Sequence, residues 1–146
     1  MNTFLIATHS IIRWMILLAG VIAIIVPLLN NINKTLEKKD KLPALFFMIM
    51  CDVQLVIGLL LYFVYSGYGA SAFHQGMGAV MKNAELRKIA IEHFALTMIA
   101  FVLVHIAYAK IKRADTFKKV RRISLIYFIS AIVLILAAVP WNRIAI

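Results

Sequence analysis

Long runs of apolar residues alternate with short polar segments along this chain. Four runs are close to the ~20 residues that an α-helix needs to cross ~30 Å of hydrocarbon. A spanning segment must pair its backbone groups internally, and no run shows the period-2 alternation of a barrel strand, so helices are expected. The predicted spans cover residues 4–29, 42–65, 87–110 and 121–140, with an irregular outer loop at 66–86. We therefore expect an all-α membrane protein, with residues 1–146 forming a single transmembrane domain.

The basic residues predict how these helices are oriented. Of the 16 Lys and Arg residues, 11 lie in two short segments, 34–41 and 110–122. Short basic segments between spans are typical of cytoplasmic loops, and loops of this length join neighbouring helices as antiparallel hairpins. The sequence therefore predicts a four-transmembrane-helix, up-down-up-down bundle with the N-terminus and the C-terminus outside.

Composition narrows the class of protein further. The chain is 64% hydrophobic and only 15% charged, against ~25% charged in ordinary soluble domains. Its net charge of +10 is explained by the position of the basic loops, which lack the interleaved aromatic residues of a nucleic-acid surface. The lipid bilayer is the expected partner, and nucleic acid is not. Cys51 is the only cysteine, so an intrachain disulfide and a CxxC redox pair are excluded.

Candidate chemistry lies in polar residues within the predicted spans. An ionisable residue at membrane depth is costly, so it is a functional hypothesis by default. The candidates are His9 and Arg13 in the first span, Asp52 and Gln54 in the second, and Glu92, His93 and His105 in the third. The fourth span offers only hydroxyl groups, and we expect it to serve in packing.

Depth predicts that two of the histidines meet. The first and third spans run in the same direction, and His9 and His93 each lie ~6 to 9 Å below the outer surface. These two spans are diagonal in an up-down-up-down bundle, so the histidines face each other across the core, as a bis-imidazole b-type haem requires. Arg13, one turn from His9, could pair with Glu92, Asp52 or a haem propionate. His105 lies ~18 Å deeper and ~120° around the helix from His93, so a second such site is not expected.

A transition metal ion is the main alternative ligand. His74 in the outer loop could join His9, His93 and Glu92 near one level, and Asp52 is a further candidate. Such a set suits zinc, copper or non-haem iron. The same residues could instead bond to one another and to backbone carbonyls. Their role would then be limited to fixing how the helices pack.

Four short motifs resemble a known family. They are HSIIRW at residues 9–14, QLVIG at residues 54–58, Glu92-His93 and Pro140-Trp141. Together they resemble the small four-helix membrane proteins of Bacteroidetes labelled cytochrome b, over nearly the whole chain. The resemblance implies a multi-pass protein of the bacterial inner membrane that binds one b-type haem through His9 and His93. Family members often carry histidine where this chain has Asp52, and this departure favours the metal alternative.

The leading hypothesis is a cytochrome b-like electron-transfer protein with one haem between the first and third helices, near the outer leaflet. It would exchange electrons with a quinone or with another electron-transfer protein. The first alternative is a metal-binding membrane protein that uses the outer His and Glu residues. The second is a non-catalytic small subunit of a respiratory membrane complex.

Overall fold

Helix dominates the structure, a computed structural model that describes residues 3–65 and 67–141. Over these residues there is no strand, and the only β-type pairing is an isolated antiparallel bridge between Thr35 and Thr116. Four stretches are helical, long and apolar enough to cross a membrane: Thr3–Leu29, Lys38–Gln75, Ala84–Lys112 and Phe117–Ala138. The all-helical class and the four candidate spans are thus confirmed, and they are consistent with a multi-pass membrane protein.

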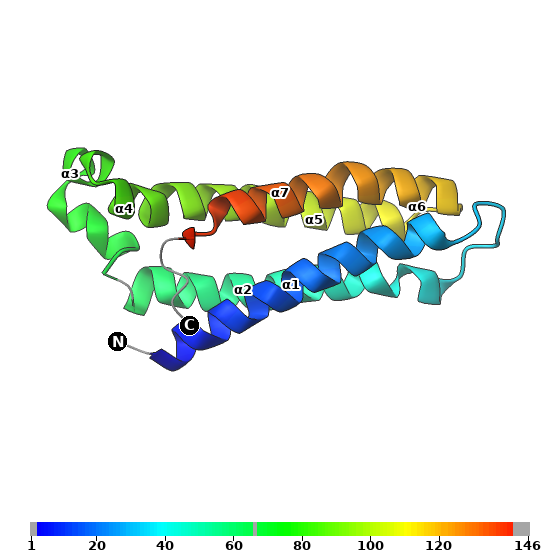
Figure 1. Cartoon of the computed structure of the whole chain (residues 1–146), viewed down its shortest axis with the longest axis horizontal. Coiled ribbons are helices and arrows are strands. Elements are labelled where there is room, and N and C mark those ends of the chain that lie inside the picture. Colours follow the sequence, from blue (N-terminus) through cyan, green and yellow to red (C-terminus); the bar gives the residue numbers. More distant parts are fainter. Residues whose placement is uncertain (1–2, 66, 142–146) are drawn as a thin grey trace.

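Three of the four stretches are helical pieces in series (Figure 1). The first is the single helix α1 (Thr3–Leu29). The second begins with a short 3₁₀ turn, η1 (Lys38–Lys41), and continues as α2 (Leu42–Leu60) and a π-helical turn, η2 (Leu61–Tyr65). The third consists of α4 (Ala84–Arg87), the π-helical turn η4 (Lys88–His93) and α5 (Phe94–Lys112). The fourth consists of α6 (Phe117–Ile123), the π-helical turn η5 (Ser124–Phe128) and α7 (Ile129–Ala138).

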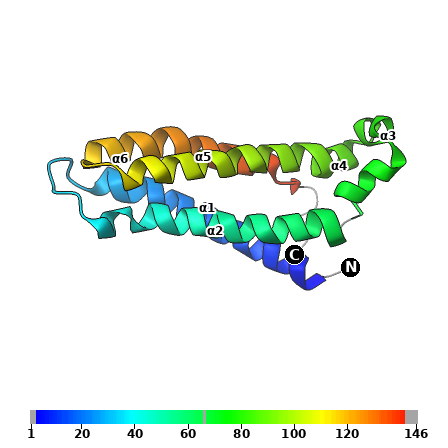
Figure 2. The same cartoon turned by 180° about the vertical axis from the view of Figure 1, so that it is seen from behind.

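The four stretches pack side by side as a four-helix bundle (Figures 1 and 2). α1 packs along α2, α2 packs against α5, and α5 packs against α7. α1 closes the ring through contacts with α6 and η5. α1 and α5 therefore lie diagonally, and residues at one level on these two helices can face each other across the core.

Capping residues fix the ends of the third and fourth stretches. The side chain of Asn83 accepts hydrogen bonds from two backbone N–H groups of the first turn, so the helix begins at residue 84 instead of 87. The side chain of Thr116 accepts one such bond, from the backbone N–H of Lys119, so α6 begins at residue 117 instead of 121. The last helix ends at residue 138, because Pro140 disfavours the helical backbone at the residue before it.

The two basic segments pack together at one end of the bundle. Arg121 donates hydrogen bonds to the carbonyl oxygens of Leu28, at 2.9 Å, and Asn30, at 3.1 Å. Lys41 donates to the carbonyl oxygen of Ala114 at 2.8 Å. Carbonyl groups at the end of a helix lack intrahelical partners, so these basic side chains stabilise the end of α1 and tie the two loops together.

A close approach of helices at Gly20 marks the centre of the core. Phe47 of α2 and Phe128 of η5 pack edge to face there, with ring centroids 5.1 Å apart, and both are fully buried. A Cβ atom at Gly20 would lie 2.9 Å from a side-chain carbon of Ile132 and 3.0 Å from one of Phe47. A larger residue at this position of α1 would push against the side chains of Ile132 and Phe47, so glycine favours this close approach of the three helices.

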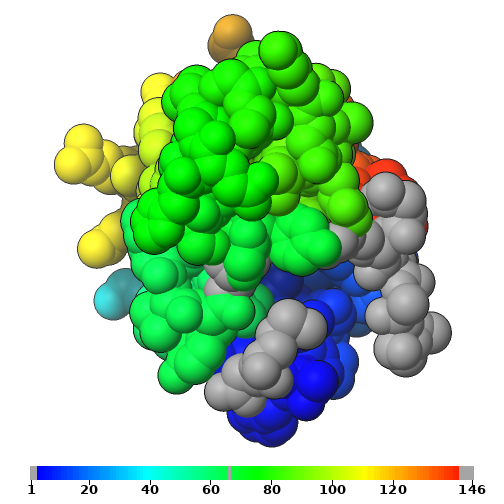
Figure 3. All heavy atoms as spheres, turned by 90° about the vertical axis from the view of Figure 1, so that its left-hand side faces the viewer, coloured from blue at the N-terminus to red at the C-terminus, as the bar shows by residue number. Residues whose placement is uncertain are grey.

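Two short helices cap the opposite end, where the sequence predicted an irregular loop. They are η3 (Ala70–Gln75) and α3 (Met77–Lys82), joined at Gly76, whose φ of +90° favours glycine. A Cβ at Gly69 would run into the carbonyl oxygen of Tyr62, so this glycine lets the cap fold back onto the end of the second stretch. Figure 3 looks onto this end and shows the cap (green) beside the start of α1 (blue).

Candidate functional site

A cavity of about 100 Å³ lies between the helices, in the half of the bundle that contains the start of α1. All four membrane stretches contribute to its walls, which are mostly apolar. Its polar lining includes His9, Arg13, Gln54, Tyr62, His93 and Thr97. A largely apolar cavity with a few converging polar groups is the usual form of a ligand site.

His9 and His93 face each other across this cavity. Their ring centroids are 6.2 Å apart, with 61° between the ring planes. His9 belongs to α1 and His93 ends the π-helical turn η4, so the pair joins the two diagonal stretches. The structure therefore brings together the two histidines proposed as haem ligands.

Hydrogen bonding fixes the orientation of the His93 ring. Its Nδ1 atom lies 3.0 Å from the carbonyl oxygen of Ala138, in the last turn of α7. A carbonyl oxygen only accepts, so Nδ1 carries the proton and Nε2 keeps its lone pair. Histidines that bind a metal usually donate their other ring N–H to a carbonyl or a carboxylate in this way.

The second stretch holds His9 from the side. The Gln54 amide donates a hydrogen bond of 3.0 Å to the backbone carbonyl of His9. A Cβ at Gly58 would lie 3.4 Å from Cε1 of the His9 ring, so a larger residue there would press on the imidazole. Gln54 and Gly58 of the QLVIG motif thus position His9 through a helix contact.

Three polar atoms at the cavity are buried without a hydrogen-bond partner in the described part of the chain. They are Nδ1 of His9, Nε of Arg13 and Oε1 of Gln54. Buried polar atoms nearly always have a partner, because an unmade hydrogen bond costs ~1 to 3 kcal/mol. All three residues line the same cavity, so a polar ligand or water there would satisfy atoms that the protein leaves unpaired.

The positive charge of Arg13 also lacks a carboxylate partner among the described residues. The two acidic side chains that it might have reached are engaged elsewhere. Glu92 pairs with Arg87, at 3.1 Å, and with Lys88, at 3.5 Å, and Asp52 pairs with His105. Arg13 has only a cation–π contact with Trp14, at 5.6 Å from the ring centroid. An unpaired cation inside a membrane protein favours an anionic ligand.

The other residues proposed as metal ligands do not join His9 and His93. Glu92, His74 and Asp52 are all absent from the lining of the cavity, and His74 lies in η3 of the cap. In the described ranges, no three His, Cys, Asp or Glu side chains gather as a metal site would require.

No family model, curated protein or solved structure matches this chain. The resemblance to the membrane cytochromes b therefore rests on the four motifs alone.

The separation of the two rings suits two imidazoles that would hold one metal ion between them. Metal–nitrogen bonds of ~2 Å, with ~1 Å more from each bonding nitrogen to its ring centre, would put the two centroids ~6 Å apart. The observed separation is 6.2 Å.

The volume of the cavity is too small for a haem as it stands. It measures about 100 Å³, whereas pockets for ligands of drug size measure ~300 to 1,000 Å³. A haem therefore requires the helices to move apart around His9. α1 contacts the fourth stretch mainly through α6 and η5, at the far end from His9 (Figure 1), so outward movement of its first half would leave those contacts in place but would disturb its packing on α2, including the hydrogen bond from Gln54 to His9.

Sequence reasoning missed two features near the site. Tyr62, which was not among the candidate residues, lines the cavity and donates a hydrogen bond of 2.8 Å to the carbonyl oxygen of Ala90. This carbonyl belongs to the π-helical turn that ends at His93, and such turns are frequent at functional sites. The second feature is the pairing of Asp52 with His105, to which the sequence assigned no shared role. No residue pattern signals either the π turn or that pair.

Proposed function

We propose that this protein is a cytochrome b-like membrane electron carrier that binds one haem through His9 and His93. The observation that supports it most directly is the approach of the two imidazoles to each other at a mostly apolar cavity, with their ring centroids 6.2 Å apart. The unpaired guanidinium of Arg13, which lines the same cavity, supports the proposal because a haem carries two propionates.

Four polar residues of the cavity have a defined task in this proposal, and His9 and His93 would hold the haem. Ala138 holds the His93 ring through Nδ1, and Gln54 holds the backbone of His9. Arg13 would neutralise a propionate, and the apolar wall would keep water from the centre. When bound, the haem would supply one-electron chemistry whose potential depends on its axial ligands and burial. The electron donor we propose is a quinol or another redox protein.

The absorption spectrum of the purified protein tests this function. After expression with ample haem, we expect a sharp Soret band that shifts on reduction with dithionite, and about one haem per chain. Colourless protein from such cells would contradict the proposal. Metal analysis would then separate the alternatives: stoichiometric zinc, copper or iron indicates a metal site, and no metal indicates a small subunit whose polar residues fix packing.

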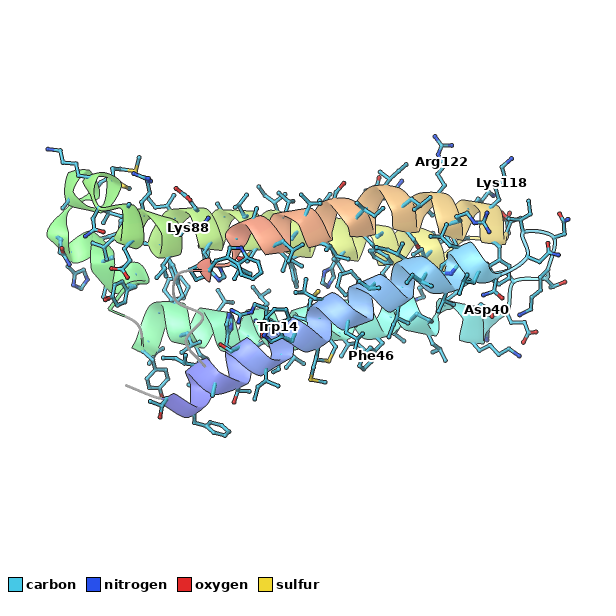
Figure 4. The ribbon with its side chains drawn as sticks, viewed as in Figure 1. Trp14, Asp40, Phe46, Lys88, Lys118 and Arg122 are labelled. Carbon is cyan, nitrogen blue, oxygen red and sulfur yellow. The ribbon has the colours of Figure 1, made fainter. Side chains whose placement is uncertain are left out.

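The orientation in the membrane is part of the same proposal. We infer an up-down-up-down bundle in a bacterial inner membrane, with both termini outside and both basic loops in the cytoplasm. Support comes from the two basic segments, which are bonded to each other at one end of the bundle. Figure 4 shows Lys118 and Arg122 projecting outward near that end, where Asp40 also lies, and Lys88 toward the opposite end.

Cysteine labelling checks this orientation. In a Cys51→Ala background, Gln75→Cys places a thiol on the exposed surface of the outer cap, and Lys118→Cys places one on the exposed surface of α6. A membrane-impermeant maleimide should label Gln75→Cys in intact spheroplasts, and Lys118→Cys only after lysis. The reverse pattern, or equal labelling before lysis, would show that the inferred orientation is wrong.

A further inference from the structure

Asp52 of α2 and His105 of α5 form an ion pair that takes no part in the cavity. Nε2 of His105 lies 3.0 Å from Oδ1 of Asp52, and Nδ1 of His105 lies 3.0 Å from the carbonyl oxygen of Phe101. The carbonyl only accepts, so Nδ1 carries a proton. The contact with Asp52 needs one further proton, on the nitrogen or on the carboxyl oxygen. In either case the pair is neutral overall, but it remains strongly polar.

This pair lies at membrane depth. Asp52 follows Lys41 by 11 residues and His105 precedes Lys112 by 7 residues, which places them ~16 Å and ~10 Å from the basic end of their helices. Both distances fall within a hydrocarbon layer of ~30 Å. At that depth, bulk water would not solvate the two side chains.

The pair nevertheless faces out of the bundle. The Asp52 side chain is 43% exposed and the His105 side chain is 35% exposed. Figure 2 looks onto the side of the bundle where α2 and α5 lie in front. Ionisable residues within membranes almost always face protein or a water-filled cavity, because contact with lipid is costly. The outward pair therefore indicates that protein covers this face.

We propose that a second copy of this chain packs on the α2–α5 face, with the Asp52–His105 pair at the contact. A two-fold interface sets one patch against the same patch of its partner. This patch carries an acid and a base side by side, so it is complementary to itself: Asp52 meets His105 of the partner subunit, and the reverse. Small or β-branched residues one turn away, Val56 on α2 and Val102 and Ala109 on α5, are exposed and would let the helices approach.

The proposal goes beyond electron transfer and does not depend on a bound haem. It makes the Asp52–His105 pair the polar contact of a membrane dimer, where interhelical hydrogen bonds contribute to association. The Asp52–His105 pair would also fix the register of the two copies, because apolar side chains on lipid-facing helices could slide past each other.

Cross-linking of the full-length protein in membranes tests the dimer. In a Cys51→Ala background, Val56→Cys places a thiol one turn from Asp52, and Val133→Cys places one on α7. The two valines are matched in type and exposure, at 59% and 57%. With a short bis-maleimide reagent, we expect Val56→Cys to give a product of twice the chain mass and Val133→Cys to give little.

A further substitution tests the role of the pair itself. Adding Asp52→Leu to Val56→Cys should lower the yield of the dimer product about threefold or more, the scale of one interhelical hydrogen bond in a membrane. Equal yields from Val56→Cys and Val133→Cys, or a Val56→Cys product with the mass of a different protein, would overturn the proposal. The comparison of the two cysteine variants retains native Asp52, so it remains decisive if Asp52→Leu fails to fold.

Discussion

Replacing His93 with alanine is expected to remove at least nine-tenths of the bound haem. Loss of a single hydrogen-bond partner behind a metal ligand already costs ~10- to 100-fold in affinity, so loss of the ligand itself should cost at least as much. His93 also has the best-defined ring in the site, because Ala138 fixes its Nδ1 atom at 3.0 Å. Haem content per chain, measured from the absorption spectrum of purified protein, checks this expectation.

His74→Ala is the matched control. It removes the same side chain from η3, outside the lining of the cavity, so it should leave the haem content at the level of the unsubstituted protein. Equal haem content in His93→Ala and His74→Ala would remove His93 from the ligand set. A loss confined to His74→Ala would move the site to the cap formed by η3 and α3.

Gly20→Leu is expected to prevent stable folding of the bundle. Even a Cβ atom there would lie 2.9 Å from a carbon of Ile132 and 3.0 Å from one of Phe47. Overpacking by a few methylene groups costs ~1 to 3 kcal/mol, and four extra carbons between three packed helices should exceed that range. We expect most of the detergent-extracted protein to elute as aggregate on size-exclusion chromatography. Any protein that remains folded should unfold at a much lower temperature than the unsubstituted protein.

Gly78→Leu is the control for this substitution. Gly78 lies in α3, and a Cβ there would meet no atom within 4 Å. This variant should elute and unfold like the unsubstituted protein. A normal elution profile and thermal stability for Gly20→Leu would show that α1 does not pack against Phe47 and Ile132 as described.

The spans were predictable because lipid imposes a simple requirement on sequence. A helix that crosses a bilayer needs an apolar run of nearly fixed length, so the four runs could be counted directly. The exact helix ends depend on individual side chains. Asn83 and Thr116 begin their helices three and four residues before the predicted starts, because a cap can act wherever its side chain reaches the free N–H groups.

The depth of a residue was easier to predict than its rotation about the helix axis. Counting residues from the start of each helix predicts that His9 and His93 lie at the same depth. In the structure, their ring centroids are 6.2 Å apart. Depth argued against a second histidine pair at His105 but did not identify its partner, Asp52, which comes from the adjacent α2. The π-helical turn at Lys88–His93 inserts a residue and alters rotation, and no sequence pattern announces it. Glu92, expected near the two histidines, instead pairs with Arg87 and Lys88.

The central claim is that His9 and His93 hold one haem iron between α1 and α5. The electron paramagnetic resonance spectrum of the oxidised protein tests this claim most directly. Two imidazole ligands give a low-spin ferric centre, whereas loss of one leaves a five-coordinate, high-spin iron. We predict a low-spin signal for the unsubstituted protein and its replacement by a high-spin signal, or its loss, in His9→Ala and in His93→Ala alike. A low-spin signal that persists in either variant, or no ferric haem signal in protein supplied with haem, would contradict the account.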